Sequence, residues 1–151
     1  MYEPEGIGAD EFYLAAGNEV TLTRKVTESV VEAFTEVSGD HSPNHVDEGN
    51  MSQSVYESRI AHGALLIAFM SACSTAIAER IPRVRDTETP VSLGYDRITF
   101  IGPEFIGDTV NLRYRVREVD AQRRRARAEI TVTNQHSRPV CIGEHILKWV
   151  S

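Results

Sequence analysis

Hydrophobic and polar positions follow several different periods along the chain, and each change of period marks a new predicted element. Residues 1–18 are rich in Gly and acidic residues and have no period, so we expect a surface arm there. Glu19–Val26 then places Val20 and Leu22 at alternate positions, as in a strand with one buried face. We therefore expect a single domain that spans residues 19–151.

A helical period follows this first strand. The next apolar residues are spaced as on one helical face: Val30, Val31, Phe34 and Val37. Thr27 or Ser29 can supply the N-cap oxygen, and the helix should end near Ser38–Gly39 because Gly is favoured just past a helix end. Asp40–Asn50 is then predicted to be a polar loop.

The segment that opens with His62 and Gly63 is apolar almost all round through Ala78, which indicates a helix buried on most sides. This helix should end before Pro82, and the charged segment Arg83–Glu88 should form a loop. Its apolar run is shorter than the ~20 residues that a membrane span requires, so we expect no membrane segment.

Beyond the loop the period becomes two, as in strands with one wet face. Four strands are predicted: Val91–Phe100, 110–117, 125–132 and Pro139–Val150. Asp120–Arg123 and His136–Ser137 fit hairpin turns. The order of elements predicts an α+β fold in which a curled antiparallel sheet wraps one central helix. A sheet of about five strands leaves open edges, which proteins often cover by forming a dimer.

Composition adds constraints on class and location. A chain of 151 residues with 41% hydrophobic and 25% charged residues is typical of one globular domain. The N-terminus is acidic and lacks the basic start and apolar run of a secretory signal, so we expect a cytoplasmic protein. Cys73 and Cys141 lack the spacing of a disulfide framework or zinc site and are expected to be packing residues.

Charge is distributed unevenly between the two parts of the chain. Residues 1–50 hold 11 acidic and 2 basic residues, which leaves 11 acidic and 14 basic residues for 51–151. Four arginines crowd one predicted turn and strand start: Arg123, Arg124, Arg125 and Arg127. No aromatic residues interleave with them, which argues against a nucleic-acid interface. A solvated hairpin face and a contact for the phosphates of a carrier or nucleotide both stay open.

Asp40 and His45 are the first candidates for catalytic residues. They lie five residues apart in the predicted loop after the first helix, where side chains can reach a cleft. An Asp after a helix commonly bonds turn backbone, and a loop His is commonly just exposed, so this spacing alone does not establish a site. A carboxylate and an imidazole that hold the same water can, however, share proton transfers.

Three sequence motifs strengthen the interpretation of Asp40 and His45 as a catalytic pair. Phe34–Asp47 resembles the signature of the (R)-specific enoyl-CoA hydratases, the MaoC-like dehydratases, in which the loop reads Asp-x-Asn-Pro-x-His. Ser42 stands where that family has Asn, so the hydrogen bond of an Asn amide is missing. Arg59–Leu65 is similar to the family's helix opening, and Gly102–Thr109 is similar to its Pro-Val-Phe-x-Gly-Asp turn.

The resemblance implies a hot-dog fold and the reversible addition of water to trans-2-enoyl thioesters, which gives (R)-3-hydroxyacyl thioesters. Asp40 and His45 would then be the acid/base pair, with the two roles unassigned because coupled groups titrate together. The Gly63 N–H, at the positive end of the long helix, would stabilise the thioester oxyanion. His62 and Ser71 would support the site. Alternatively, Gly63 only permits close packing, His62 caps the helix, and Ser71 bonds its own preceding turn.

The resemblance also implies partners and rivals. The expected substrate is an acyl thioester of coenzyme A or of an acyl carrier protein, with no separate cofactor, and the expected assembly is at least a homodimer. Independently of the resemblance, we expect no metal because no His, Cys or carboxylate cluster in the sequence shows ligand spacing. One rival function is a 3-hydroxyacyl-carrier-protein dehydratase, and another is a non-catalytic hot-dog subunit that binds acyl thioesters. Retention of both Asp40 and His45 argues against the second. A hot-dog thioesterase would need a differently placed carboxylate. His41, His136 and His145 have no partner motif and are assigned no role.

Overall fold

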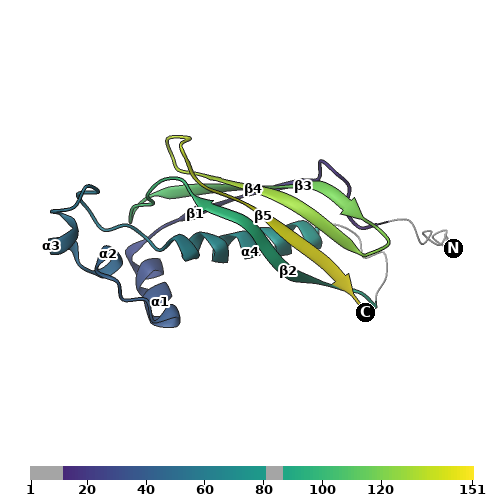
Figure 1. Cartoon of the computed structure of the whole chain (residues 1–151), viewed down its shortest axis with the longest axis horizontal. Helices are drawn as coiled ribbons and strands as arrows, with labels where there is room; N and C mark the ends of the chain where they lie inside the picture. Colours follow the sequence, from purple (N-terminus) through teal and green to yellow (C-terminus); the bar gives the residue numbers. More distant parts are fainter. Residues whose placement is uncertain (1–11, 81–86) are drawn as a thin grey trace.

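The computed structural model describes residues 12–80 and 87–151. Its elements follow in the order β1 Glu19–Lys25, α1 Glu28–Ser38, α2 Pro43–Val46, α3 Glu48–Met51, α4 Gly63–Glu79, β2 Thr89–Phe100, β3 Thr109–Asp120, β4 Arg125–Thr133 and β5 Pro139–Val150. Figure 1 shows the strands as one curved sheet with α4 lying along it, and α1, α2 and α3 grouped beyond one end of α4. This arrangement confirms the predicted α+β fold with a curled antiparallel sheet and a central helix.

The sheet has the strand order β1-β3-β4-β5-β2, and every neighbouring pair is antiparallel. Short hairpins connect β3 to β4 and β4 to β5, whereas β1 and β2 reach their partners only after long excursions of the chain. These two strands therefore form the edges of the sheet. The edge strand β2 exposes Val91, Leu93 and Phe100, and Ile101 just beyond it is also exposed.

The core lies between α4 and the inner face of the sheet. One face of α4 is buried through Leu65, Leu66, Met70, Cys73 and Ile77. It meets alternating side chains of the long strands: Val110, Leu112, Tyr114, Val116, Ile130 and Val132. The other face of α4 is open within the single chain and carries small exposed residues: Ala64, Ala68, Ser71 and Thr75. The all-round apolar pattern predicted burial on most sides, and this open face is the part that departs from it.

The segment that carries Asp40 and His45 begins as predicted, but it contains more structure than a loop. Thr27 caps α1 by accepting from the Val30 N–H, and Gly39 ends it with a left-handed φ of 73°. The prediction of a polar loop over Asp40–Asn50 is wrong because two four-residue helices form there. Pro43 starts the first of them, where its missing N–H has no consequence, and the Asp47 carboxylate caps the second.

The ends of the chain also pack differently from the prediction. Residues 1–11 of the expected arm and 83–86 of the expected charged loop lie outside the described residues. Within the described part of the arm, Tyr13 and Leu14 are buried in the core and Tyr13 stacks on Trp149 with ring centroids 4.9 Å apart, whereas residues 15–18 are exposed as expected. Glu88 is buried as well and pairs with Arg124 at 2.7 Å. None of the described helices is long and apolar enough to cross a membrane.

Candidate active site

Asp40 is held in place by the backbone at the end of α1. Its N–H donates to the Ser38 Oγ at 3.1 Å, and its Oδ1 accepts from the Ser42 N–H at 3.1 Å. With Oδ1 committed to the turn, Oδ2 faces His45, which Pro43 brings back on the short helix α2. Ser42 occupies the position of the family's Asn, and here its backbone rather than its side chain contacts the carboxylate.

Asp40 and His45 face each other without a direct hydrogen bond. The His45 Nε2 lies 3.8 Å from the Asp40 Oδ2, beyond hydrogen-bonding distance. The His45 Nδ1 lies 2.7 Å from the carbonyl oxygen of Ile60, and because a carbonyl only accepts, Nδ1 carries a proton. In the neutral ring Nε2 is then a free acceptor directed at Asp40. Two acceptors at this separation can both bind one water or hydroxyl group.

His62 connects the two members of the pair. Its ring stacks on His45 with centroids 3.8 Å apart and planes at 27°, and its Nε2 donates to the Asp40 carbonyl oxygen at 3.0 Å. The residue is 2% exposed. It occupies the N-cap position of α4 but makes no side-chain capping bond, so a capping role is not supported. The contacts place His62 as a support for the Asp40 backbone and the His45 ring.

Gly63 begins α4 beside this pair and lines a cavity of about 370 Å³ together with His45. The first amides of a helix have no intrahelical acceptor, so they are available to a ligand. The structure also supports the packing alternative, because a Cβ on Gly63 would approach the Phe100 ring to 2.8 Å. The two interpretations concern different atoms of one residue, its N–H and the space beside its Cα, so a variant is needed to separate them.

Glu104 is a residue of this cavity that the sequence reasoning missed. It stands in the third motif, where the family reads Val, and that departure is the signal that could have identified it. Its side chain is 3% exposed, and both carboxylate oxygens lack a hydrogen-bond partner among the described residues. Burial, together with the charge of Asp108, raises the pKa of Glu104 to about 8. At neutral pH this carboxyl is therefore mainly protonated.

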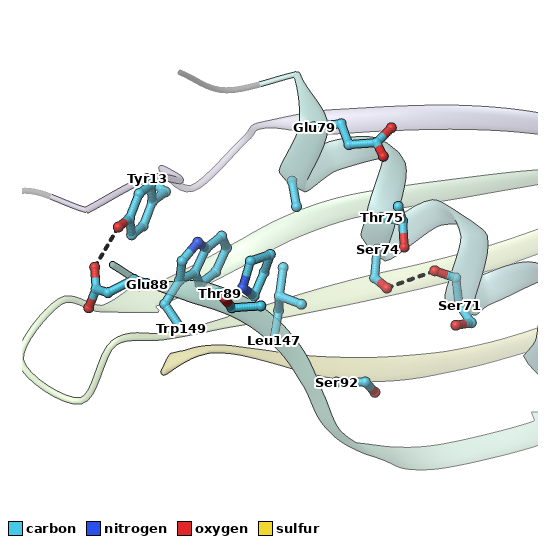
Figure 2. A pocket seen from close by; sticks show the side chains of 12 residues that line it. Tyr13, Ser71, Ser74, Thr75, Glu79, Glu88, Thr89, Ser92, Leu147 and Trp149 are labelled. Carbon is cyan, nitrogen blue, oxygen red and sulfur yellow. Dashed lines mark hydrogen bonds between the residues drawn. The ribbon is translucent and has the colours of Figure 1, made fainter. Parts of the chain in front are cut away.

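Ser71 does not lie in the cavity that contains His45. It is exposed on the open face of α4, and its carbonyl accepts from the Ser74 hydroxyl at 2.7 Å. Its side chain lines a different cavity, shown in Figure 2, rather than the one that contains His45. Within the described part of this chain, the structure thus brings together Asp40, His45, His62 and Gly63, but it does not bring Ser71 to them.

The absence of ligand spacing in the sequence predicted no metal, yet Asp40, His45 and His62 each offer a ligand atom within 4.8 Å of the others. The grouping arises from the fold and is invisible in the sequence. The two rings are nearly parallel, so the lone pairs of their nitrogens lie in separate planes and do not converge on one point. This geometry fits proton transfer better than tetrahedral metal coordination.

The chain is similar to a group of known proteins in sequence and in fold. The family model described as MaoC like domain matches residues 14–139. A 3-hydroxybutyryl-CoA dehydratase of Methylorubrum extorquens is 30% identical over 118 residues, which cover 78% of this chain and 70% of that protein. An (R)-specific enoyl-CoA hydratase of Rhodospirillum rubrum is 34% identical over 62% of this chain and 60% of its own length. The solved structure of an R-hydratase from Pseudomonas aeruginosa has 29% identity and a TM-score of 0.76, covering 91% of this chain and 87% of that one.

Proposed function

Because the chain belongs to the MaoC-like dehydratase family, we propose that it is a hydro-lyase that interconverts trans-2-enoyl thioesters and (R)-3-hydroxyacyl thioesters. The observation that carries the proposal is the placement of Asp40 and His45. Their free acceptor atoms lie 3.8 Å apart, and the His45 ring is fixed in one tautomer by the Ile60 carbonyl. Relatives named as enoyl-CoA hydratase and 3-hydroxybutyryl-CoA dehydratase support the reaction class.

In the hydration direction, the pair binds one water molecule between the Asp40 Oδ2 and the His45 Nε2. One of the two groups takes a proton from the water as its oxygen attacks C3 of the enoyl thioester. The thioester carbonyl gains negative charge, and C2 then receives a proton, so the elements of water are added across the double bond. Two polarised groups on one water are suited to this exchange because each can hold the proton that the other releases.

The Gly63 N–H is proposed as the donor to the thioester oxyanion. It lies at the positive end of α4, where backbone amides and the helix dipole both favour negative charge. His62 holds Asp40 and His45 in position relative to each other, through its hydrogen bond to the Asp40 carbonyl and its stacking contact with the His45 ring. No residue in this scheme requires a cofactor other than the carrier that holds the acyl group.

The carrier is proposed to be a phosphopantetheine thioester, either coenzyme A or an acyl carrier protein. The arginines expected to contact phosphates are largely engaged with acidic neighbours. Arg127 pairs with Asp96 at 2.8 Å, and Arg124 pairs with Glu88 at 2.7 Å. These pairs favour the solvated hairpin face over a phosphate site. Turnover measured with the same enoyl group on both carriers would decide between them.

We propose that two copies assemble through the edge strand β2 and the open face of α4. The exposed apolar residues of this region support a partner: Val91, Leu93, Phe100 and Ile101. An unpaired, apolar edge is normally covered in a soluble protein. The dimer predicts that light scattering at micromolar concentration gives twice the chain mass, and that Leu93→Glu shifts the mass toward that of one chain. A monomeric wild-type protein would contradict it.

The experiment that tests the function follows the loss of enoyl-thioester absorbance over a panel of chain lengths, with chiral analysis of the product. The expected result is hydration to the (R)-3-hydroxyacyl thioester. A non-catalytic binding subunit would bind the thioesters and leave the absorbance unchanged. A thioesterase would instead release free thiol, which a thiol reagent detects.

A further inference from the structure

Arg59 takes no part in the proposed proton transfers, yet its side chain contacts the segment that carries His45. Its Nη1 donates to the His45 carbonyl oxygen at 3.3 Å. Its Nη2 lies 2.7 Å from both carboxylate oxygens of Glu28, and its Nε donates to Glu48 at 3.0 Å. Glu28 begins α1 and Glu48 begins α3, so one guanidinium joins the three short helices that are grouped beyond one end of α4 (Figure 1).

The next residue, Ile60, completes this set of contacts. Its N–H donates to the Asn44 carbonyl oxygen at 3.0 Å, and its own carbonyl accepts from the His45 Nδ1 at 2.7 Å. The segment is itself anchored, because the Ala61 N–H donates to the Glu104 carbonyl oxygen at 2.7 Å. The main chain of α2 is therefore bonded at two successive carbonyls, and the His45 ring at one nitrogen, by a segment that is fixed in turn.

Apolar packing contributes little to the placement of α2. Of its four residues, Pro43, Asn44 and Val46 are exposed and only His45 is buried. His45 also borders open space twice, since it lines the cavity of about 370 Å³ that contains Gly63 and a second hollow of about 490 Å³ beside α1. A helix of one turn has no stability of its own. Its position therefore depends on the polar contacts from Arg59 and Ile60.

The chemistry of these contacts suits arginine in particular. Hydrogen bonding to Glu28 raises the pKa of Arg59, so the guanidinium stays charged. Its donors point in several fixed directions and reach three partners at once, which a single ammonium group cannot do. The side chains of Glu28 and Glu48 are 50% and 57% exposed, and ion pairs with such exposed partners stabilise a fold only weakly. The contacts of Arg59 therefore matter more for geometry than for stability.

We propose that Arg59 is a positioning residue, which holds α2 so that the His45 Nε2 faces Asp40. This role rests on the proposed function, since the orientation matters for proton transfer through one water. Asp40 follows the end of α1 and Glu28 begins α1, so the guanidinium ties the helix before Asp40 to the carbonyl of His45. A misplacement of about 1 Å in a reacting group can lower a rate by about 10²-fold.

Arg59→Met tests this role, because it removes the guanidinium and keeps most of the apolar stem. The kcat for enoyl-thioester hydration should fall by about 10–10²-fold. KM should change little, since Arg59 lies outside the lining of the cavity that contains His45 and Gly63. Arg59→Lys keeps the charge but not the fork, and it should recover only a small part of the loss. Full recovery by Lys would overturn the role.

The tautomer of the His45 ring gives a readout that does not depend on turnover. Long-range proton–nitrogen NMR correlations distinguish protonated from unprotonated ring nitrogens, and the signals missing in His45→Gln identify the residue. At alkaline pH the wild-type protein should show the Nδ1–H form alone, as the bond to the Ile60 carbonyl requires. Arg59→Met should show both tautomers. A wild-type tautomer in this variant, with or without a loss of turnover, would overturn the role.

Arg113→Met is the matched control, because it removes another exposed ion pair, the contact of Arg113 with Glu19 at 2.8 Å between β3 and β1. It should leave kcat and the His45 signals as in wild type. A loss of kcat as large as that in Arg59→Met would show a general effect of removing an arginine and would overturn the role.

Glu28→Gln keeps the test decisive if Arg59→Met does not fold. It weakens the bond that anchors the guanidinium to α1, so kcat should fall by a smaller factor and the second tautomer of His45 should appear. Wild-type values of both in a folded Glu28→Gln protein would overturn the role. If no enoyl thioester were hydrated by the wild-type protein, the proposed function would fail, and the NMR comparison would still decide whether Arg59 fixes the His45 ring.

Discussion

Two histidines in this molecule have one ring nitrogen fixed by the protein, and the fixing groups are opposite in kind. His45 donates from Nδ1 to the Ile60 carbonyl, which leaves Nε2 as an acceptor. The Tyr114 hydroxyl is fully buried and has no other acceptor among the described residues, so it donates to the His145 Nδ1, and in the neutral ring Nε2 is left as a donor. The same side chain is thus prepared to take up a proton in one region and to give a fixed hydrogen bond in the other.

The two regions also differ in how completely their polar groups are satisfied. Of the described residues, three buried side-chain atoms have no hydrogen-bond partner: His62 Nδ1, Glu104 Oε1 and Glu104 Oε2. His62 stacks on His45, and Glu104 lines the cavity that contains it, whereas both nitrogens of His145 are bonded. Unsatisfied buried groups are unfavourable and concentrate where a ligand or a reaction needs them. This difference supports the proposed proton transfer in the first region, whereas the hydrogen bonds of the second region hold His145 at both ring nitrogens.

The largest expected effect comes from removing the proton-transfer groups of the first region. Asp40→Asn and His45→Gln should each lower kcat/KM for enoyl-thioester hydration by about 10²–10⁴-fold, the usual effect of losing a placed acid or base. Because both groups act on one water, the double variant should be little worse than the worse single variant. Unchanged circular dichroism is the control. Turnover near wild type in either variant would remove the pair from the mechanism.

Gly63→Ala tests the proposed stabilisation of the thioester oxyanion by the Gly63 N–H in the same region. Loss of one oxyanion donor should lower kcat by about 10²–10³-fold, with a much smaller effect on the binding of a saturated acyl-CoA. Since the new methyl would meet the Phe100 ring, the double variant Gly63→Ala with Phe100→Ala provides the control. A persistent loss in the double variant supports the oxyanion role, whereas recovery of turnover would show that the contact with Phe100 caused it.

Glu104, in the region of His45, should make the free energy of unfolding depend on pH. Its pKa is about 8 in the folded protein and near 4.5 when unfolded, so between these values unfolding releases a proton. The free energy of unfolding should therefore fall as pH rises through this range, by up to ~1.4 kcal/mol per pH unit from this group alone. Glu104→Gln should be progressively more stable than wild type from pH 5 to 8 in urea titrations. A stability difference that does not vary with pH would show that the carboxyl is ionised.

The smallest effect concerns stability in the second region. His145→Phe removes the acceptor of the buried Tyr114 hydroxyl and should lower the free energy of unfolding by about 1–3 kcal/mol. Adding Tyr114→Phe to it should restore part of that loss, because the unpaired hydroxyl is then absent. Denaturant titrations of the single and double variants measure this coupling. Strictly additive losses would mean that the two residues do not interact.

The sequence predicted features that depend on local rules and missed those that depend on register. The sequence offered Thr27 or Ser29 as the cap of α1, and the structure uses Thr27. The end of α1 at Gly39 and the strand Pro139–Val150 agree with the structure as predicted, because all of these features follow from nearby residues. The helices α2 and α3 were missed because four residues are too few to display a period. The signature motif located Asp40 and His45, and the fold places them face to face.

His145 shows the limit of sequence reasoning more clearly. On β5 it occupies an inward position among apolar residues, and nothing near it in the sequence suggests a partner. Its two hydrogen-bond partners lie 31 and 53 residues away and meet it only because the strands pair in one register. Glu104 was missed for a related reason, since its burial follows from the way the third motif packs against the rest of the chain.

The stacking of Tyr13 on Trp149 has a consequence for how this protein is made. The first described residues complete their packing against the last strand, so nearly the whole chain separates two groups in contact. During synthesis the N-terminal segment leaves the ribosome long before its site exists. The edge strand β2 likewise has to wait for β5. A topology with such distant contacts folds slowly for its size, and the apolar surface of α4 stays uncovered until the strands that follow it have been made.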